Sequence, residues 1–408
     1  MSKLKVIIVG AGLGGLCLAQ SLRRLDIEVE VFERDKTPWD RPQGYRLHLD
    51  SDGINAIHQS LPHKLYELFD ATSMKPLSFT TIVDTSLAIQ RRIPDDEHGS
   101  TQDHSFQGAP AHMNVNRATL RQILLAGMDD IVHFGKTLTR YESDETGVTA
   151  IFEDGTKSKA DLLVGADGIR SPVRKQRLPH AETQDSGIRA IYGRLPLTEA
   201  IKLVTDQVRG DTFTVALDSK RLFLGLGPVV FPTRPDKAAL QLMPTADLRP
   251  QEDYVVCIIG GRKEFFGQED SRLSALSSEE LQKFSMQLMK EWPDNTTAIP
   301  AHGDSKSFFY VEMYTSVPCE LPKSANVTLL GDAIHAMTPT LGRGANIAMR
   351  DGALLARHLG DVVEGRQKLA QAISQYETEM TTYGFDVVKK SAAMGVRLVG
   401  QNPLPSGC

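Results

Sequence analysis

Three glycine-bearing segments, each behind an apolar run, constrain the fold of this chain more than any other feature. They are Gly10-Ala11-Gly12-Leu13-Gly14-Gly15, Gly165-Ala166-Asp167-Gly168 and Gly331-Asp332-Ala333. The apolar run before each of them is typical of a buried β-strand. Any one segment alone is a weak signal. Together they predict one large dinucleotide that is bound along its whole length.

Length and charge limit the remaining possibilities. A chain of 408 residues is too long for one ordinary core, so two or more domains are expected. The net charge of −5 is small, and no run of Lys or Arg stands out, which disfavours nucleic acid and anionic membranes as partners. No segment approaches the roughly 20 apolar residues that cross a bilayer, so no integral membrane segment is expected. Lys3 and Lys5 before an apolar run resemble a signal peptide, but the glycine spacing favours the nucleotide interpretation.

The four cysteines are scattered along the chain and form no C-x-x-C pair or metal-ligand spacing. This pattern is typical of a reducing compartment, so a cytoplasmic location is expected. No metal site, no nucleophile motif of the Ser/His/Asp type and no obligatory protein partner is predicted.

The pattern along the chain predicts an α/β protein in which a dinucleotide domain is interrupted by a β-sheet domain. A βαβ start is expected from Lys5–Val9, Leu13–Arg24 and Glu28–Phe32. Antiparallel strands are expected at Ile188–Arg194, Thr212–Leu217, Leu222–Gly227 and Tyr254–Ile259. Residues 85–110 are interpreted as an irregular, exposed excursion. Two helical stretches, Leu369–Tyr376 and Val387–Val399, follow the last part of the dinucleotide domain.

The resulting division has seven parts. The dinucleotide domain comprises residues 1–75, 111–180 and 326–365. The sheet domain comprises an excursion at 76–110 and the main part at 181–275. Residues 276–325 form a helix and the return connection, and residues 366–408 form C-terminal helices.

The first segment has the G-x-G-x-x-G pattern. Gly10 permits a tight turn, Gly12 lets the backbone approach a pyrophosphate, and Gly15 lets the helix pack on the strand. Glu33 follows at the end of the second strand, where a carboxylate takes a ribose 2′-hydroxyl. Arg34 comes next and could lie over the adenine or its phosphate. A glycine-rich turn that binds nothing is the disfavoured alternative.

The other two segments are more ambiguous by themselves. Asp167 between its glycines can reach ligand hydroxyls or can serve an ordinary turn. Asp332 follows the strand at 327–330, and a loop from Thr338 to Gly344 then enters a helix. The positive N-terminus of that helix suits an anionic ring system, whereas a helix capped by its own loop would point at water.

The motifs together resemble a known family. They are Gly10–Gly15 with Glu33-Arg34, Gly165-Ala166-Asp167-Gly168-x-x-Ser171-x-Val173-Arg174, and Gly331-Asp332-Ala333-x-His335-x-x-x-Pro339-x-x-Gly342-x-Gly344. In this order and spacing they resemble the group A, single-component FAD-dependent monooxygenases, such as para-hydroxybenzoate hydroxylase and the tetracycline-inactivating monooxygenases. The resemblance covers about residues 4 to 380. It implies a Rossmann-like, GR2-type FAD domain with a mixed or antiparallel substrate sheet.

The resemblance also implies roles for residues. Arg117 would contact FAD near its phosphates and ribityl chain, Asp167 would serve FAD and nicotinamide binding, and Asp332 would hold ribityl or phosphate-side hydroxyls. The loop Gly342–Asn346 would offer backbone N–H groups to the flavin pyrimidine edge, and Arg46 or His48 could lie near flavin N5. The full set of expected FAD contacts is Gly10, Gly12, Leu13, Gly14, Gly15, Glu33, Arg34, Arg117, Asp167, Gly331, Asp332, Pro339, Gly342, Gly344, Ala345 and Asn346.

Arg343 stands where relatives often have Gln, and we expect it to point to solvent. For the substrate, Ala190, Tyr192 and Arg194 share one strand face, as do Thr212, Thr214 and Ala216 on another, and either face could line the pocket. Tyr192 and Arg194 are candidate substrate contacts or outer-face residues. His112 is interpreted as structural, and no catalytic base is named.

The activity that the resemblance implies is oxygenation of a small to mid-sized aromatic, polyketide or alkaloid substrate. NADPH or NADH would reduce tightly but non-covalently bound FAD, and O₂ would react through a C4a-(hydro)peroxyflavin. A dehydrogenase or reductase without oxygen activation and a Baeyer–Villiger outcome stay open as alternatives. A flavin halogenase is disfavoured because its W-x-W-x-x-P motif is absent from a chain whose tryptophans are Trp39 and Trp292.

Overall fold

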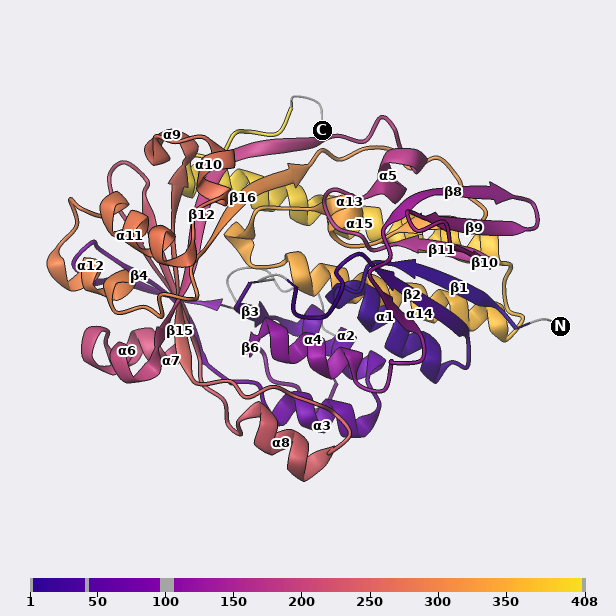
Figure 1. The fold of residues 1–408 in the computed structure, drawn as a ribbon, viewed down its shortest axis with the longest axis horizontal. Coiled ribbons are helices and arrows are strands. Elements are labelled where there is room, and N and C mark those ends of the chain that lie inside the picture. Colours follow the sequence, from indigo (N-terminus) through magenta and orange to yellow (C-terminus); the bar gives the residue numbers. More distant parts are fainter. Residues whose placement is uncertain (1–2, 41–43, 96–105, 406–408) are drawn as a thin grey trace.

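Figure 1 shows the computed structural model, which describes residues 3–40, 44–95 and 106–405. Two large sheets dominate it, and a two-stranded ribbon lies between them. The first sheet is five-stranded and entirely parallel, in the order β17-β11-β1-β2-β7. Its strands are β1 (Lys5–Val9), β2 (Glu28–Glu33), β7 (Val132–Phe134), β11 (Leu162–Gly165) and β17 (Val327–Leu329).

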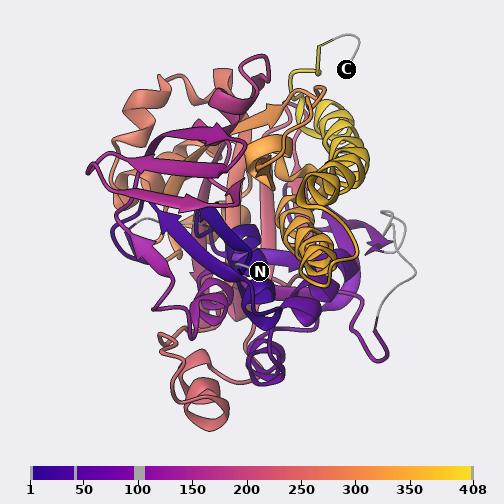
Figure 2. The same cartoon turned by 90° about the vertical axis from the view of Figure 1, so that its right-hand side faces the viewer.

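Continuous apolar sequence explains the parallel sheet. Val6, Ile7 and Ile8 are fully buried because both faces of the sheet are covered, one by helices and the other by the strands at residues 138–160. The helices α1 (Leu13–Arg24) and α14 (Gly344–Val363) pack closely on each other, since a Cβ at Gly14 would lie 2.6 Å from the Ala348 carbonyl oxygen. Figure 2 shows α14 beside the long helix α15 (Leu369–Val399) on one flank of the molecule.

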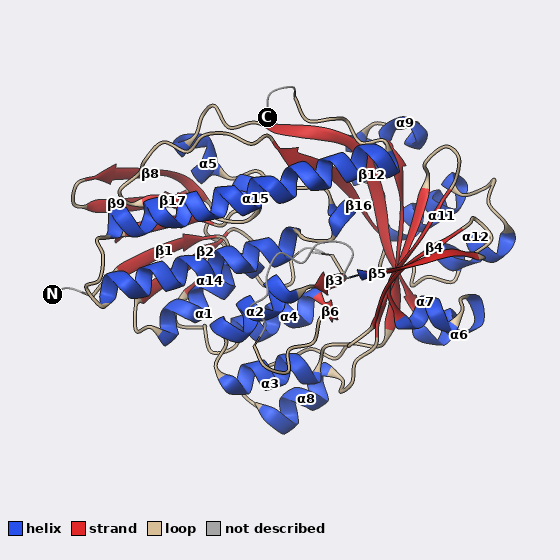
Figure 3. Cartoon of the chain, turned by 180° about the vertical axis from the view of Figure 1, so that it is seen from behind, coloured by secondary structure: helices blue, strands red, loops and turns tan. Residues whose placement is uncertain are grey.

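The second large sheet is seven-stranded and mixed, in the order β16-β12-β15-β14-β13-β4-β5. Its strands are β4 (Leu77–Val83), β5 (Ile89–Pro94), β12 (Thr183–Pro196), β13 (Asp211–Leu217), β14 (Phe223–Val229), β15 (Tyr254–Arg262) and β16 (Phe309–Ser316). All neighbours are antiparallel except β13 and β4, which pair in parallel. Figure 3 shows this sheet nearly edge-on, with helices on its outer side and the parallel sheet on its inner side.

Smaller elements complete the structure. The ribbon pairs β3 (Arg46–Leu49) with β6 (Met113–Asn116), and a three-stranded sheet consists of β8 (Leu138–Asp144), β9 (Gly147–Phe152) and β10 (Lys157–Ala160). The remaining helices are α2 (Ser51–Ser60), α3 (His63–Ala71), α4 (Arg117–Leu125), α5 (Pro172–Arg177), α6 (Leu197–Leu203), α7 (Asp206–Gly210), α8 (Pro235–Leu242), α9 (Lys263–Phe266), α10 (Asp270–Ser274), α11 (Ser278–Leu288), α12 (Asp294–Ala301), α13 (Asp332–His335) and the 3₁₀ turn η2 (Pro339–Leu341).

The expectation of an irregular excursion at residues 85–110 is wrong for residues 89–94, while residues 85–88 and 106–110 are irregular as expected. β5 forms there and pairs with β4 at the edge of the seven-stranded sheet. Five of its six residues are exposed, so this edge strand lacks the apolar alternation that marks a half-buried strand. The part of the expectation that falls on residues 96–105 lies outside the described residues.

The two predicted C-terminal helical stretches are a single helix, α15. The gap between them contained Thr381, Thr382 and Gly384, which are weak helix formers. Packing overrides this weakness, because Gly384 lets α15 approach the His335 ring and Met380 is fully buried. The predicted fold class, a Rossmann-like α/β domain with a mixed β-sheet domain and C-terminal helices, is confirmed.

Candidate dinucleotide and substrate site

The structure brings the three glycine-bearing segments together at the carboxyl ends of β1, β11 and β17. The Ala166 N–H donates to the Val9 carbonyl (2.8 Å), and the Leu330 N–H donates to the Gly165 carbonyl (3.0 Å). A Cβ at Gly10 would lie 2.3 Å from the Ala166 carbonyl oxygen. This edge of an open parallel sheet is where such folds bind ligands.

The loop before α1 has one open position. Gly10 has a φ of +111°, which L side chains rarely adopt, and its surroundings are filled. At Gly12, by contrast, an added Cβ would meet nothing within 4 Å. No side chain caps α1 at Gly12, and its first turn holds no acidic residue. The free N–H groups and the positive end of the helix therefore fit the pyrophosphate of a dinucleotide.

Glu33 stands at the end of β2 beside this loop and is 5% exposed. Its Oε2 accepts a hydrogen bond from the Ala11 N–H (2.8 Å), and its Oε1 accepts one from the Asp35 N–H (3.0 Å). Each carboxylate oxygen can accept a second hydrogen bond, so a ribose hydroxyl remains compatible with this position. The neighbouring Arg34 is exposed.

Arg121 was not predicted, although it holds the same loop. It is 4% exposed, and its Nε donates to the Ala11 carbonyl (2.9 Å) while its Nη1 donates to the Pro38 carbonyl (2.8 Å). Its position one helical turn after Arg117 was the only available sequence signal.

Asp167 has the properties of a ligand-binding carboxylate. Its Oδ2 accepts from the Val173 N–H (3.2 Å), whereas its Oδ1 is buried and accepts from no described residue. Burial raises the pKa of Asp167, although hydrogen bonds from Ser171 and the Val173 N–H oppose the rise. A buried acceptor without a partner is costly, so a ligand hydroxyl at Oδ1 would relieve this cost.

Arg174 joins the second and third segments. Its Nη1 donates to the Ala333 carbonyl (2.9 Å) and its Nη2 to the Ile169 carbonyl (2.6 Å). Burial lowers the pKa of this guanidinium, while the Asp167 carboxylate raises it. The arginine of the Asp167 motif thus fixes the distance between the two loops.

A buried acid lies directly behind the third segment. Asp351 on α14 is fully buried, and its Oδ2 accepts from the Gly331 N–H (2.8 Å) and from His335 Nε2 (2.7 Å). Its Oδ1 accepts from the Tyr383 hydroxyl of α15 (2.6 Å). Asp332 itself begins α13 and is exposed on the ligand edge of the sheet.

The pairing of His335 with Asp351 makes stability depend on pH. Burial lowers the pKa of His335, but the charge and hydrogen bond of Asp351 outweigh it, so the pKa is raised above 6.5. The stabilisation is then fully present below the unfolded-state pKa and is lost as pH rises through the folded-state pKa. We expect the free energy of unfolding, measured in urea, to fall as the pH rises above about 6.5. The His335→Gln variant should show a flatter profile; an equally steep one would contradict this assignment.

The Asp332→Ala variant should bind flavin more weakly while its folding stability stays nearly unchanged. Because Asp332 is exposed, its removal should change the free energy of unfolding by less than about 0.5 kcal/mol. Flavin retention should fall if the carboxylate holds ligand hydroxyls. Flavin content after gel filtration is the measurement, and Asp386→Ala, an exposed position on α15, is the control. Unchanged flavin content would remove Asp332 from the site.

The expectation that Arg343 points to solvent is wrong. Arg343 is 7% exposed, its Nε lies 3.0 Å from Asp50 Oδ2, and its Nη2 pairs with Asp52. Burial raises the pKa of Asp50, while Arg343 lowers it. The arginine therefore ties the loop before α14 to the start of α2.

The same loop is shaped for a backbone contact. Gly342 follows η2 with a φ of 66°, in the left-handed region. The Asn346 side chain is fully buried and donates to the Gly342 carbonyl (3.1 Å) and the His48 carbonyl (2.9 Å). It also accepts from the Asp50 N–H (3.0 Å). Asn346 thus has a structural side chain, and only its backbone is available for the predicted flavin contact.

The two candidates on β3 face different neighbours. The Arg46 guanidinium donates to Asn114 Oδ1 (2.6 Å) and lies 5.2 Å from the centre of the Phe213 ring of the seven-stranded sheet. Burial lowers its pKa to about 10. His48 lies by the loop before α14, since a Cβ at Gly342 would be 3.8 Å from His48 Nδ1.

The inner face of the seven-stranded sheet carries Ala190, Tyr192 and Arg194. Tyr192 stacks on Phe309 (5.4 Å between ring centres), and Arg194 lies over the Tyr45 ring (4.9 Å) and pairs with Asp304 (3.2 Å). Arg194 thus has protein partners on this face. Ala216, with Thr212 and Thr214, belongs to the outer face, where it packs in the core formed with α6 and α11.

Tyr192 lies where the seven-stranded sheet approaches the start of α4. Burial raises the pKa of Tyr192 to about 12, while the charge of Arg117 lowers it, so the two side chains are close. Arg117 begins α4, and its N–H donates to the Tyr45 carbonyl (2.6 Å). The partly exposed side chains Phe213, Val215, Phe223, Ile258 and Val311 extend this apolar, aromatic face.

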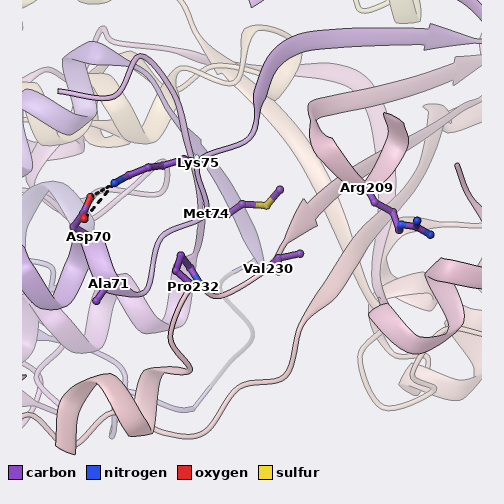
Figure 4. A pocket seen from close by; sticks show the side chains of 7 residues that line it. All are labelled: Asp70, Ala71, Met74, Lys75, Arg209, Val230 and Pro232. Carbon is purple, nitrogen blue, oxygen red and sulfur yellow. Dashed lines mark hydrogen bonds and ion pairs between the residues drawn. The ribbon is translucent and has the colours of Figure 1, made fainter. Parts of the chain in front are cut away.

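A separate open pocket of about 590 Å³ lies at the seam between α3 and the seven-stranded sheet. Figure 4 shows Lys75 paired with Asp70 on one side and Arg209 on the other, with Met74, Val230 and Pro232 between them. None of the predicted site residues lines it. We assign it no role.

The FAD binding domain family matches residues 3–391. The dual O-methyltransferase/FAD-dependent monooxygenase elcB of Phaeosphaeria nodorum is 31% identical over 440 residues, which cover 98% of this chain and 46% of elcB. The FAD-dependent monooxygenase thnD of Trichoderma harzianum is 29% identical, covering 95% of this chain and 91% of thnD. The chain therefore spans about half the length of elcB and most of thnD.

Solved structures agree with these matches. A candidate FAD-containing monooxygenase from Photorhabdus luminescens has a TM-score of 0.80 and 29% identity, covering 97% of this chain and 99% of its own. Klebsiella pneumoniae HpxO, solved with FAD and uric acid, has the same fold with a TM-score of 0.75, 22% identity and coverage of 97% and 89%. Within the described part of this chain, no helix is long and apolar enough to cross a membrane.

Proposed function

Because the chain belongs to the FAD-binding domain family, we propose that it is a monooxygenase that depends on NADPH or NADH and uses O₂. It would bind one FAD non-covalently. Its substrate would be a small to mid-sized aromatic, polyketide or alkaloid molecule, which it would oxygenate. One observation carries the cofactor assignment. The three glycine-bearing segments converge around the open position at Gly12 and the unpartnered Oδ1 of Asp167. Both features fit a long ligand that has a pyrophosphate and several hydroxyls.

Different residues would bind different parts of the cofactor. Gly12 and the N-terminus of α1 would hold the pyrophosphate, and Glu33 would hold the adenosine ribose. Asp167 and Asp332 would bind hydroxyls of the central chain, and the Gly342 loop would face the ring. When bound, FAD supplies the redox and oxygen chemistry, and the protein supplies position and a water-poor pocket.

The inner sheet face supports the proposed substrate class. Tyr192, Phe213 and Phe223 are partly exposed there and offer flat aromatic surface to a planar molecule. Gly225 and Gly227 keep this face shallow, because a Cβ at either position would collide with Phe213 or Arg46. The face is thus suited to a flat ring system rather than to a highly charged substrate.

Turnover under isotopically labelled O₂ tests the proposal. The purified protein, checked for stoichiometric FAD, is mixed with NADPH or NADH and a panel of hydroxylated naphthalenes and anthraquinones. A product that gains one labelled oxygen atom is expected. An oxidised product without label would favour a dehydrogenase, and a labelled lactone from a ketone substrate would favour Baeyer–Villiger oxygenation. A protein that cannot take up FAD would contradict the whole proposal.

A further inference from the structure

The residues that follow α15 connect the loop before α14 with the seven-stranded sheet. Figure 3 shows α15 reaching from beside the parallel sheet to β16. The helix ends at Gly400, whose φ of 72° lies in the left-handed region and turns the chain. Residues 400–403, here called the strap, then contact two neighbours. Gln401 contacts the loop before α14 (residues 338–344), and Asn402 contacts the sheet.

Gln401 is the contact on the loop side. Its side chain is 2% exposed and lies on Gly395 of α15, where an added Cβ would collide with Gln401 Oε1. The same Oε1 accepts a hydrogen bond from the Thr338 hydroxyl (2.7 Å), and Thr338 is also 2% exposed. The strap therefore holds the first residue of the loop that is proposed to face the flavin ring.

A second contact holds this end of the loop to α15. Ser391 is fully buried, and its hydroxyl donates to the Thr338 carbonyl (2.7 Å). The Thr340 hydroxyl donates to the Ser391 carbonyl (2.8 Å). Ser391 thus fixes the backbone of the loop to the helix, whereas Gln401 fixes the Thr338 side chain to the strap.

Asn402 anchors the strap on the seven-stranded sheet. Its N–H donates to the Ser186 carbonyl (2.8 Å), and its Nδ2 donates to the Asp185 carbonyl (3.1 Å), both on β12. Its Oδ1 accepts a hydrogen bond from Arg262 Nη1 of β15 (2.7 Å). The β12 contacts fall where the pairing of β12 with β16 shifts register, as at a β-bulge. Adjacent residues of the strap therefore hold the flavin loop and the substrate sheet.

Packing alone does not account for a glutamine at position 401. Gln401 Nε2 is buried and donates to no acceptor among the described residues. An amide N–H that is buried without an acceptor costs free energy, and an apolar side chain of the same length would avoid this cost. The hydrogen bond to Thr338 is the feature that an apolar residue cannot supply.

We propose that Gln401 is a positioning residue for the flavin ring, which fixes Thr338 and, through the strap, ties the loop before α14 to the substrate sheet. This inference rests on the proposed function, in which that loop faces the ring. Gln401 itself touches neither the ring nor the substrate and acts through Thr338. The strap restricts the loop before FAD arrives, so less conformational entropy is lost when FAD binds.

The coupling between the strap and FAD must run in both directions, because linkage between two sites is reciprocal. If the strap favours the loop conformation that binds FAD, bound FAD also stabilises the strap. The N–H groups of Gln401 and Asn402 report this effect, since they donate to the Gly395 carbonyl (3.1 Å) and the Ser186 carbonyl (2.8 Å).

Hydrogen exchange of the full chain, read by mass spectrometry, is the first test. Exchange in a peptide that contains residues 400–405 should slow at least about fivefold when FAD is added. A peptide from α6, on the outer side of the seven-stranded sheet, is the reference and should change by less than about twofold. A strap whose exchange FAD leaves unchanged, or slows no more than that of α6, overturns the proposal.

The Gln401→Met variant is the second test. It keeps the length of the side chain and removes the acceptor of the Thr338 hydroxyl. In a fluorescence titration, the affinity for FAD should fall at least about tenfold, and the visible absorption band of the bound flavin should shift because the ring is held differently. Gln375→Met, at an exposed position on α15, is the matched control and should change neither. Wild-type affinity and spectrum in Gln401→Met would contradict the positioning role.

Two further variants distinguish positioning from local packing, and they carry the test if Gln401→Met does not fold. Thr338→Val removes the same hydrogen bond from the loop side, so it should weaken FAD binding alone but add less than about twofold to the loss in Gln401→Met. Asn402→Ala removes side-chain bonds to the sheet only, and it should weaken FAD binding at least about threefold. Wild-type affinity in either single variant, or fully additive losses in the double variant, overturns the proposal.

Failure of this proposal differs from failure of the proposed function. A wild-type protein that takes up no FAD contradicts the proposed function and, with it, the role of the strap. A wild type that binds FAD stoichiometrically, with unchanged exchange in the strap and unchanged affinity in the variants, contradicts the positioning role alone.

Discussion

Replacing Gly12 with valine is expected to abolish FAD retention while the FAD-free protein keeps its free energy of unfolding to within about 0.5 kcal/mol. Gly12 has a φ of −78° and a ψ of 176°, which any residue adopts, and an added Cβ meets no protein atom within 4 Å. The isopropyl group would instead fill the space before α1 where the pyrophosphate is proposed to lie. We expect the affinity to fall at least 100-fold, about 2.7 kcal/mol, in a fluorescence titration with FAD.

Two other glycines provide the comparison. Gly360→Ala on α14 creates only an ordinary contact with Leu25 (3.5 Å) and should leave both affinity and stability nearly unchanged. Gly10→Ala should damage the fold as well as binding, because its Cβ would lie 2.3 Å from the Ala166 carbonyl oxygen and its φ is +111°. If Gly12→Val retains FAD at wild-type affinity, the pyrophosphate does not lie at this turn.

The second large effect is expected from Asp351→Ala. This change leaves the Gly331 N–H, the buried His335 ring and the Tyr383 hydroxyl without their shared acceptor. Removing one partner of a buried ion pair costs about 3–5 kcal/mol, and we expect a loss of this size in urea unfolding. FAD retention should fall too, since the Gly331–Asp332 turn loses its anchor on α14.

Tyr383→Phe is the matched control for this network. It removes a single hydroxyl from Asp351 and should cost only about 1 kcal/mol. An Asp351→Ala variant that is no less stable than Tyr383→Phe would show that the carboxylate is not held as a charged pair with His335.

The parts of the fold that the sequence predicts are those set by local chemistry. Gly10 and Gly12 identified the first βαβ unit, because a tight turn between a strand and a helix has few solutions. The side chains of Asn116 and Ser277 cap the starts of α4 and α11, and both residue types are typical of a helix start. The resemblance to FAD-dependent monooxygenases, which rests on such local motifs, is confirmed by the family match.

The parts that were missed depend on distant partners. Arg343 is buried because it meets Asp50 and Asp52 in space, and these residues precede it in the chain by 293 and 291 positions. Arg121 contacts the carbonyl of Ala11, and Asp351 contacts the N–H of Gly331, and neither backbone contact leaves a pattern in sequence. β5 was not predicted for a different reason. An exposed edge strand needs no alternation of apolar residues, so its sequence carries no strand pattern.

The expected roles of Glu33, Arg117 and Asp332 in FAD binding stay predictions. Glu33 and Asp332 stand beside the converging segments, whereas Arg117 lies beside Tyr45 and Tyr192. Glu33 already receives two backbone hydrogen bonds, which sequence spacing alone does not reveal.

The order of strands along the chain has a consequence for biosynthesis. The seven-stranded sheet is complete once residue 316 has left the ribosome, whereas β17 of the parallel sheet follows only at residues 327–329. β17 pairs with β11, which is translated earlier. The parallel sheet, which carries the three glycine-bearing segments, therefore receives its last strand after the seven-stranded sheet does. A nascent chain of this protein thus contains every strand of the seven-stranded sheet before it contains every strand of the parallel sheet.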